Sequence, residues 1–179
     1  GEWQTTLGEG LQGKTLGVIG LGRLGSQVAS VGRAFGMSVV AWSENLTRER
    51  TDEVGVELAR SKAELLERAD VVTIHLVLSE RTRGLVGAAE LGLMRESAYL
   101  VNTSRGPIVD EGGLVEALRS GSIAGAGLDV FDTEPLPAGH PLLSLDNVVL
   151  TPHVGYVTKE TYEVFYGEAV EGIVAFLDG

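Results

Sequence analysis

The stretch VIGLGRLGSQVASVGRAFGMSVVAWSEN (residues 18–45) decides the fold of this chain. It opens with an apolar run, and three glycines in the spacing GxGxxG follow, at Gly20, Gly22 and Gly25. A second apolar run, MSVVAW at 37–42, ends the unit. Strand, glycine turn, helix and second strand together make a βαβ unit of about 30 residues.

The helix of this unit is indicated by apolar residues spaced by three or four positions. They are Leu24, Val28, Val31 and Phe35. Gly36 follows directly and is typical of a helix C-terminus.

The glycines between strand and helix predict a dinucleotide-binding turn. Gly20 would permit the tight turn, Gly22 would let a pyrophosphate approach the backbone, and Gly25 would let helix and strand pack closely. The helix N-terminus offers free N–H donors for phosphate oxygens, and Arg23 adds a cation. A turn with a purely structural role is the alternative.

The end of the second strand usually carries an acidic residue that binds the adenosine ribose, and here Ser43 stands there. A carboxylate would repel a 2′-phosphate, so Ser43 admits NADP. Asn45, Thr47 and Arg48 could donate hydrogen bonds to that phosphate, whereas Glu44 could turn inward and serve NAD. We expect NAD or NADP as the cofactor, with a slight lean to NADP.

Strand and helix patterns alternate over the rest of the chain, which predicts an α/β fold of the Rossmann type: one doubly wound parallel sheet with helices on both faces. Ser61 and Glu64 form the pattern of a capping box, each side chain bonding the other's free backbone N–H, at the start of a helix that ends at Arg68. The remaining strands are predicted at 55–59, 70–77, 98–104, 124–131 and 147–153, and the remaining helices at 87–94, 110–119 and from Thr158 onward.

Composition narrows the partners and the compartment. The 179 residues are 44% apolar and 22% charged, which fits one globular domain over 1–179. A net charge of −11 disfavours nucleic acid as a partner. Apolar runs such as 71–78 are far shorter than the roughly 18 residues of a membrane span, so no membrane association is expected. Without cysteine the chain has no disulfide or thiolate metal site, and we expect a reducing, cytoplasmic location and no bound metal.

Three segments at predicted strand ends carry the residue types that hydride chemistry on an oxo acid requires. VNTSRGPIVDE (101–111) contains Arg105, whose planar guanidinium can bind a carboxylate through two hydrogen bonds. GLDVFDTEP (127–135) contains Asp129 and Glu134, and TPHVG (151–155) contains His153. Ligands bind at the carboxyl ends of strands in an open parallel sheet, so these loops are expected to converge there. Taken alone, Arg105 before Gly-Pro is more simply a turn arginine, and Glu134 before Pro135 a loop carboxylate.

Together with GLGRLG (20–25), these motifs closely resemble the D-isomer-specific 2-hydroxyacid dehydrogenase family, which includes phosphoglycerate dehydrogenases and glyoxylate/hydroxypyruvate reductases. The resemblance covers essentially the whole chain. It implies hydride transfer between a nicotinamide cofactor and a small 2-oxo or 2-hydroxy acid. Glu134, where formate dehydrogenases carry glutamine, argues against formate.

The resemblance also implies roles for individual residues. His153 would be the acid and base at the carbonyl oxygen, Glu134 would orient its ring and stabilise its protonated form, and Arg105 would orient the substrate. The implied cofactor contacts are Asp129 at the nicotinamide carboxamide, Arg23 and Leu24 at the pyrophosphate, Ser43 at the ribose, Thr103 and Ser104 under the nicotinamide ribose, His75 and Thr82 on the adenine side, and Gly20, Gly22, Gly25, Arg105, His153 and Gly155 as further members of the site.

Two of the three histidines have less specific alternatives. His75 lies at the end of a buried strand, where a packed core residue is a common role. The segment HLVLSERT (75–82) also departs from the family pattern at Val77 and Ser79, which weakens the adenine-side assignment. His140 is expected to be solvated in a loop and receives no role.

The family resemblance carries three wider expectations. A second, substrate-binding domain of the family is missing from this chain, so negligible turnover is expected from the chain alone. A homodimer that pairs through this domain is expected. The alternatives to an enzyme are a non-enzymatic dinucleotide sensor, similar to the corepressors that resemble this family, and a purely structural domain.

Overall fold

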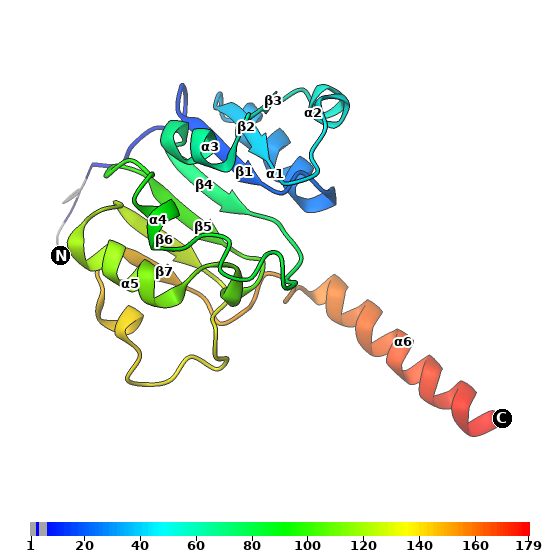
Figure 1. The fold of residues 1–179 in the computed structure, drawn as a ribbon. Helices are drawn as coiled ribbons and strands as arrows, with labels where there is room; N and C mark the ends of the chain where they lie inside the picture. Colours follow the sequence, from blue (N-terminus) through cyan, green and yellow to red (C-terminus); the bar gives the residue numbers. More distant parts are fainter. Residues whose placement is uncertain (1–2, 4–6) are drawn as a thin grey trace.

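The computed structural model describes residue 3 and residues 7–179. Its centre is a seven-stranded sheet, parallel throughout, in the order β3-β2-β1-β4-β5-β6-β7 (Figure 1). The predicted fold class is thereby confirmed. The strands are β1 (Thr15–Ile19), β2 (Ser38–Trp42), β3 (Glu57–Leu58), β4 (Val71–Ile74), β5 (Tyr99–Asn102), β6 (Gly125–Leu128) and β7 (Val148–Leu150).

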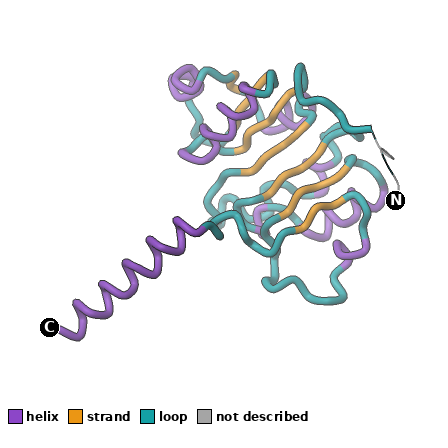
Figure 2. Tube along the Cα trace, turned by 180° about the vertical axis from the view of Figure 1, so that it is seen from behind, coloured by secondary structure: helices purple, strands orange, loops and turns teal. Residues whose placement is uncertain are grey.

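Helices cover the sheet from both sides. One face is packed by α3, α4 and α5, and the other, at β1 and β2, by α1 and α2 (Figures 1 and 2). The helices are α1 (Arg23–Ala34), α2 (Arg48–Val54), α3 (Lys62–Arg68), α4 (Ala88–Leu91), α5 (Glu111–Ser120) and α6 (Lys159–Asp178), with short 3₁₀ helices η1 (Gly106–Ile108) and η2 (Pro141–Ser144).

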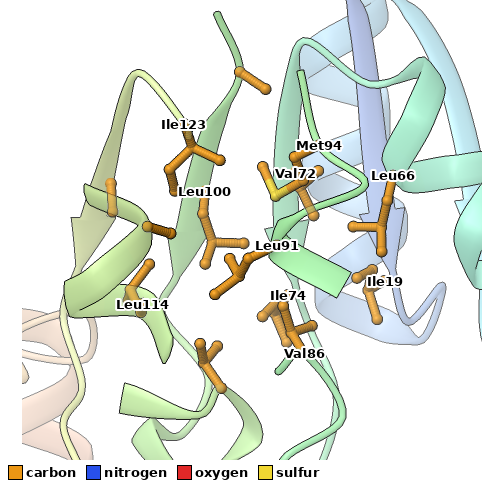
Figure 3. Close-up of a cluster of buried hydrophobic side chains, with 14 of the residues drawn as sticks. Ile19, Leu66, Val72, Ile74, Val86, Leu91, Met94, Leu100, Leu114 and Ile123 are labelled. Carbon is orange, nitrogen blue, oxygen red and sulfur yellow. The ribbon is translucent and has the colours of Figure 1, made fainter. Parts of the chain in front are cut away.

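The larger core lies between the sheet and the layer of α3, α4 and α5. Leu91 of α4 points between Ile74 of β4 and Leu100 of β5, and all three side chains are almost wholly buried (Figure 3). Burial of each such side chain stabilises the fold by about 1.5–3 kcal/mol. This core holds the strands in register and so fixes where their carboxyl ends meet.

Helix α1 forms as predicted, and its small residues face the sheet. Its buried residues are Gly25, Ala29 and Gly32, whereas Val31 and Phe35 are more than half exposed. The reason is close packing, because a Cβ at Gly32 would lie 2.6 Å from Leu16 Cδ2. Small residues let this helix approach the strands closely. The spacing of large apolar residues in the sequence does not reveal which small residues are buried.

One of the two hydrogen bonds of the capping box predicted at α3 is present, and the other is replaced. Ser61 Oγ accepts the Glu64 N–H at 3.1 Å, but Glu64 Oε2 accepts the N–H of Arg60 at 2.7 Å instead of that of Ser61. Glu64 bonds the backbone one residue further back than predicted, because the Arg60 guanidinium donates to the same carboxylate oxygen.

The last helix, α6, extends away from the body of the molecule (Figures 1 and 2). None of its residues is buried, and the apolar side chains of Phe165, Ile173 and Phe176 are more than half exposed. Among the described residues no helix is both long enough and apolar enough to cross a membrane.

The sheet reverses its strand order between β1 and β4, and this reversal positions the site. At the carboxyl end of β1, the Gly20 N–H donates to the Trp42 carbonyl at 2.9 Å, and the His75 N–H donates to the Ile19 carbonyl at 2.8 Å. The glycine turn is thus anchored to β2 on one side and β4 on the other. Ligands of open α/β sheets bind at such a point.

Candidate active site

The three glycines of the turn meet different surroundings. A side chain at Gly25 would collide with the Gly20 carbonyl oxygen, and one at Gly20, where φ is +100°, would lie 2.6 Å from the His75 carbonyl oxygen. At Gly22 a Cβ would meet nothing within 4 Å. Two glycines therefore serve packing, and the third leaves the backbone open to approach from outside.

The N-terminus of α1 faces this open space. Gly22 is its N-cap and makes no side-chain capping bond, and Ser26 Oγ donates back to the Gly22 carbonyl at 2.7 Å. Arg23 and Leu24 at the start of the helix are exposed. Free N–H donors, the helix dipole and an accessible backbone suit the pyrophosphate of a dinucleotide.

Two cavities share Ser43, and one of them adjoins the turn. One, of about 360 Å³, is lined by the glycine turn, Ser43 and His75, and the other, of about 440 Å³, by Trp42, Ser43 and Thr82. Thr82 Oγ1 donates to the Val77 carbonyl at 2.7 Å and so closes the loop after β4. Both predicted adenine-side residues therefore border this region.

His75 combines the two interpretations given above. Its Nε2 lies 2.9 Å from Thr73 Oγ1, and burial lowers the pKa of its ring, so it is neutral at pH 7. It is packed beneath the cavity and also contributes to its wall.

Three cations line a cavity together with Ser43, and the sequence reasoning missed all of them: Arg50 beside the glycine turn, and Lys62 and Arg81 in the adjoining cavity. Arg48 lines a separate cavity with Asp52 and Glu57. Arg50 borders the cavity of the glycine turn, and its guanidinium donates to the Leu21 carbonyl at 3.3 Å and to Ser26 Oγ at 2.8 Å. The side chains of residues 48 and 50 point to different sides of α2. The sequence predicts these directions only when the first residue of the helix is known.

At the other end of the same sheet edge, His153 and Glu134 are in contact. His153 Nδ1 lies 2.7 Å from Glu134 Oε2, and the other oxygen, Oε1, accepts the Phe131 N–H at 2.9 Å. Burial raises the pKa of Glu134, but the hydrogen bonds from His153 and Phe131 and the nearby charges outweigh it and leave this pKa below the ordinary value. A carboxylate so held accepts the Nδ1 proton and leaves Nε2 for another partner.

His153 has an unusual backbone conformation, with φ of +54°. Asp129, only 5% exposed, holds the loop in this shape, because its carboxylate accepts Thr151 Oγ1 at 2.5 Å, Val154 N at 2.8 Å and Gly155 N at 2.9 Å. Burial raises the pKa of Asp129, and these three hydrogen bonds lower it further than burial raises it. Carboxylates have about four acceptor positions, so one more donor can be taken.

Arg105 stands near this pair without bonding to it. Its Nη1 donates to the carbonyl of the preceding residue, Ser104, at 2.6 Å, and its charge is among those that lower the pKa of Glu134. Buried Asn102 shapes the loop: Nδ2 donates to the Arg105 carbonyl at 3.0 Å, and Oδ1 accepts the Ser104 N–H at 3.1 Å. Thr103 is exposed beside it. The sequence reasoning gave Asn102 no role.

An apolar cavity of about 480 Å³ opens beside the imidazole, with Phe131, Leu136 and Leu150 in its wall. Within the described residues, no three His, Cys, Asp or Glu side chains are grouped to hold a metal ion.

The expectation that His140 is solvated is wrong. Its side chain is 15% exposed, and Nε2 lies 2.9 Å from Glu111 Oε1. A loop histidine before proline gives no sign in sequence of a partner 29 residues away.

A parallel sheet with an open glycine turn at its strand reversal, and a carboxylate–imidazole pair along the same edge, are the features of a dinucleotide-binding domain. Residues 1–155 match the family described as D-isomer specific 2-hydroxyacid dehydrogenase, NAD binding domain. The chain belongs to this family.

Its relatives include enzymes and solved structures from bacteria and archaea. A glyoxylate reductase of Aeropyrum pernix is 51% identical over 173 residues, which are 97% of this chain and 51% of the relative. A phosphoglycerate oxidoreductase structure from Vibrio cholerae superposes with a TM-score of 0.94 at 40% identity, over 99% of this chain and 58% of the other. A D-lactate dehydrogenase from Aquifex aeolicus, solved with NAD and lactic acid, gives 0.84 at 35% identity, over 97% and 56%. The chain thus spans about half the length of these relatives.

Proposed function

We propose that this chain is the cofactor-binding part of an NAD(P)-dependent enzyme that interconverts small 2-oxo acids and D-2-hydroxy acids. The contact of 2.7 Å between His153 Nδ1 and Glu134 Oε2 carries the proposal, because it fixes the tautomer that an acid–base imidazole needs. The relatives described above are oxidoreductases by name, which favours an enzyme over the non-enzymatic sensor and the structural domain.

In this proposal His153 moves the proton. During reduction Nε2 gives its proton to the carbonyl oxygen of the oxo acid, and during oxidation it takes the hydroxyl proton back. Glu134 holds Nδ1 and stabilises the imidazolium that forms in the oxidation direction. The nicotinamide cofactor, when bound, supplies the hydride to the carbonyl carbon of the oxo acid or accepts it from the corresponding carbon of the hydroxy acid.

Arg105 is the substrate-binding cation of the proposal. It is exposed, its charge reaches Glu134, and two parallel N–H bonds to a carboxylate require only that its side chain turn away from the Ser104 carbonyl. Such a pairing would orient the oxo acid with its carbonyl toward His153.

The glycine turn would hold the cofactor pyrophosphate, with Gly22, Arg23 and Leu24 nearest to it. Asp129 would accept the nicotinamide carboxamide with its remaining lone pair, next to Gly155. Thr103 and Ser104 would lie under the nicotinamide ribose, and His75 and Thr82 on the adenine side. The open space at Gly22 supports this placement.

We further propose NADP in preference to NAD, a finer assignment than the family itself gives. The cavity between the glycine turn and the end of β2 is lined by Ser43, Asn45 and Thr47, and Arg50 is its one cation among the described residues. No carboxylate residue is among those that line it. Glu44 lines the adjoining cavity that shares Ser43, and Arg50 is ion-paired with Glu53 at 3.0 Å, so the preference rests on the absence of a carboxylate at position 43 itself.

The experiment is a parallel titration with NADH and NADPH of the chain and its Ser43→Asp variant. The variant is expected to weaken NADPH binding more than NADH binding, since a carboxylate at this position repels the 2′-phosphate. Ser38→Asp, an exposed position at the opposite end of β2, is the matched control. An unchanged preference in Ser43→Asp would refute the assignment.

Three wider proposals complete this function. Residues 1–179 form the dinucleotide-binding domain, and the substrate domain of the family is needed for turnover at ordinary rates. The domain pairs into a homodimer, for which the exposed Val31 and Phe35 on one face of α1 offer apolar surface. The location is cytoplasmic, since a chain without cysteine suits a reducing compartment.

The function itself is tested by assaying an enzyme that carries this domain against a panel of 2-oxo acids with NADH or NADPH. Oxidation of the cofactor with at least one acid is expected. No oxidation across the panel, in a preparation that still binds the cofactor, would favour the dinucleotide sensor instead.

A further inference from the structure

We propose that Glu111 and His140 form a positioning pair for the acid–base site, holding the turn that orients Glu134. This inference rests on the proposed function for its catalytic consequence. Its structural part, that the position of Glu111 determines the position of Glu134 and through it that of His153, is argued from contacts within this chain.

The connection runs through two successive backbone amides. The Phe131 N–H donates to Glu134 Oε1 at 2.9 Å, and the next N–H, that of Asp132, donates to Glu111 Oε2 at 3.3 Å. One short piece of backbone is therefore held between two carboxylates, of which one contacts His153. A shift of this backbone toward or away from Glu111 would change the place of Glu134.

His140 holds Glu111 in turn. His140 Nδ1 accepts the Leu142 N–H at 3.3 Å, so the ring proton lies on Nε2, where it donates to Glu111 Oε1 at 2.9 Å. The two side chains are 15% and 23% exposed, which limits competition from water. The molecule thus contains two carboxylate–imidazole pairs, Glu134–His153 at the site and Glu111–His140 behind it.

The same residue links the two loops that carry the proposed catalytic groups. Glu111 is the first residue of α5, which begins soon after Arg105 and η1. Gly106 is packed so tightly against the Phe131 backbone that a Cβ there would collide with its carbonyl group. Glu111 therefore joins the Arg105 loop to the Glu134 loop at a second point, which fixes their relative orientation.

The first test observes the imidazole signals of the 179-residue chain by NMR. The chain has three histidines, which can be assigned with His140→Gln and His153→Gln. In Glu111→Ala the His153 ring signals are expected to move in the same direction as in Glu134→Gln. Glu116→Ala is the matched control, because Glu116 is exposed on the same helix and its carboxylate makes no hydrogen bond or ion pair with the described residues.

The outcome that overturns the proposal is a His153 signal unchanged in Glu111→Ala while the His140 signal moves. If Glu111→Ala does not fold, Glu111→Gln replaces it, since the amide keeps the shape and one acceptor oxygen. His140→Gln should then produce a shift of His153 as well, and its failure to do so would remove His140 from the pair.

The second test uses an enzyme that carries this domain. Glu111→Ala is expected to lower kcat by about 10-fold to 100-fold, because a displacement of about 1 Å at a reacting group has effects of this size. The Kd of the cofactor should stay unchanged, and Glu116→Ala should alter neither. Equal losses in kcat and cofactor affinity would mark a general structural role and contradict positioning. An unmodified enzyme without any turnover would refute the proposed function, and the NMR result alone would then decide the inference.

Discussion

The glycine turn and the acid–base pair lie along one edge of the sheet but are built in opposite ways. Gly20, Gly22 and Gly25 act within six consecutive residues, and their surroundings are mostly backbone. Glu134 and His153 are 19 residues apart and meet only because two loops after β6 and β7 are folded against each other. The first region depends on the absence of side chains, and the second on their exact partners. Binding and chemistry should therefore be separable by substitution.

The largest expected effect is on chemistry. In an enzyme that carries this domain, His153→Gln should lower kcat by about 10²-fold to 10⁴-fold, the usual contribution of a general acid or base. The dinucleotide Kd should change far less than kcat, because the glycine turn at another part of the edge would hold the pyrophosphate. His140→Gln is the matched substitution, and it should have a smaller effect on kcat. A large loss of cofactor affinity in His153→Gln would show that the two regions are not separable.

The next effect distinguishes two glycines of the same turn. Gly25→Ala should destabilise the fold by about 3 kcal/mol, since its methyl group has no room beside the Gly20 carbonyl. Gly22→Ala should cost less than about 1 kcal/mol, because its methyl group meets nothing within 4 Å and only the poorer N-cap preference of alanine opposes it. Urea unfolding of both variants measures the difference. Equal stability of the two would contradict the division between packing and ligand approach.

A third prediction concerns the anchor of the His153 loop. Asp129→Asn should destabilise the fold by about 1–3 kcal/mol at pH 7, since an amide nitrogen would replace one oxygen that now faces an N–H or O–H donor. The pKa of Asp129 is lowered in the folded chain, so its stabilisation is fully present above the unfolded value of about 3.9 and is lost as the pH falls through the folded pKa. The stability gap between the two proteins should shrink on acidification below about pH 4. A gap independent of pH would exclude the ionised carboxylate as its source.

The smallest expected effect is a loss of stability at a position outside both regions, which serves as a control for the other variants. Ser61→Ala removes the hydroxyl that accepts the Glu64 N–H and should cost about 1 kcal/mol of stability. It lies on α3, outside both regions, so cofactor affinity and kcat should not change. A change in either would mean that loss of stability alone disturbs the site.

The sequence predicted most of what is local. The alternation of apolar runs and helices gave the parallel sheet, and the strand–glycine–helix context identified the turn. The apolar spacing predicted helix α1 but not its buried residues, because Gly25, Ala29 and Gly32 are buried through close approach and not through hydrophobicity. Small residues carry no apolar signal of their own.

The non-local contacts were out of reach. Arg50 could not be distinguished from Arg48 without the start of α2, and the Glu111–His140 contact joins residues that no motif connects. The position of the Glu134 and His153 loops at one edge was expected from the strand ends, whereas the pairing of the two side chains was expected only through the resemblance to a family. Their separation along the chain gives no geometric information, whereas the order of β6 and β7 in the folded sheet supplies it.

The most direct measurement is a titration of the 179-residue chain with NADH and NADPH, monitored by fluorescence energy transfer from its tryptophans. One of them, Trp42, lines the cavity that shares Ser43 with the cavity at the glycine turn. We predict saturable binding of at least one dinucleotide, an affinity weaker by about tenfold or more in Gly22→Ala, and an unchanged affinity in Glu134→Gln. Binding that is equally strong in Gly22→Ala, or that is absent from the unmodified chain, would contradict the assignment of the glycine turn to the cofactor.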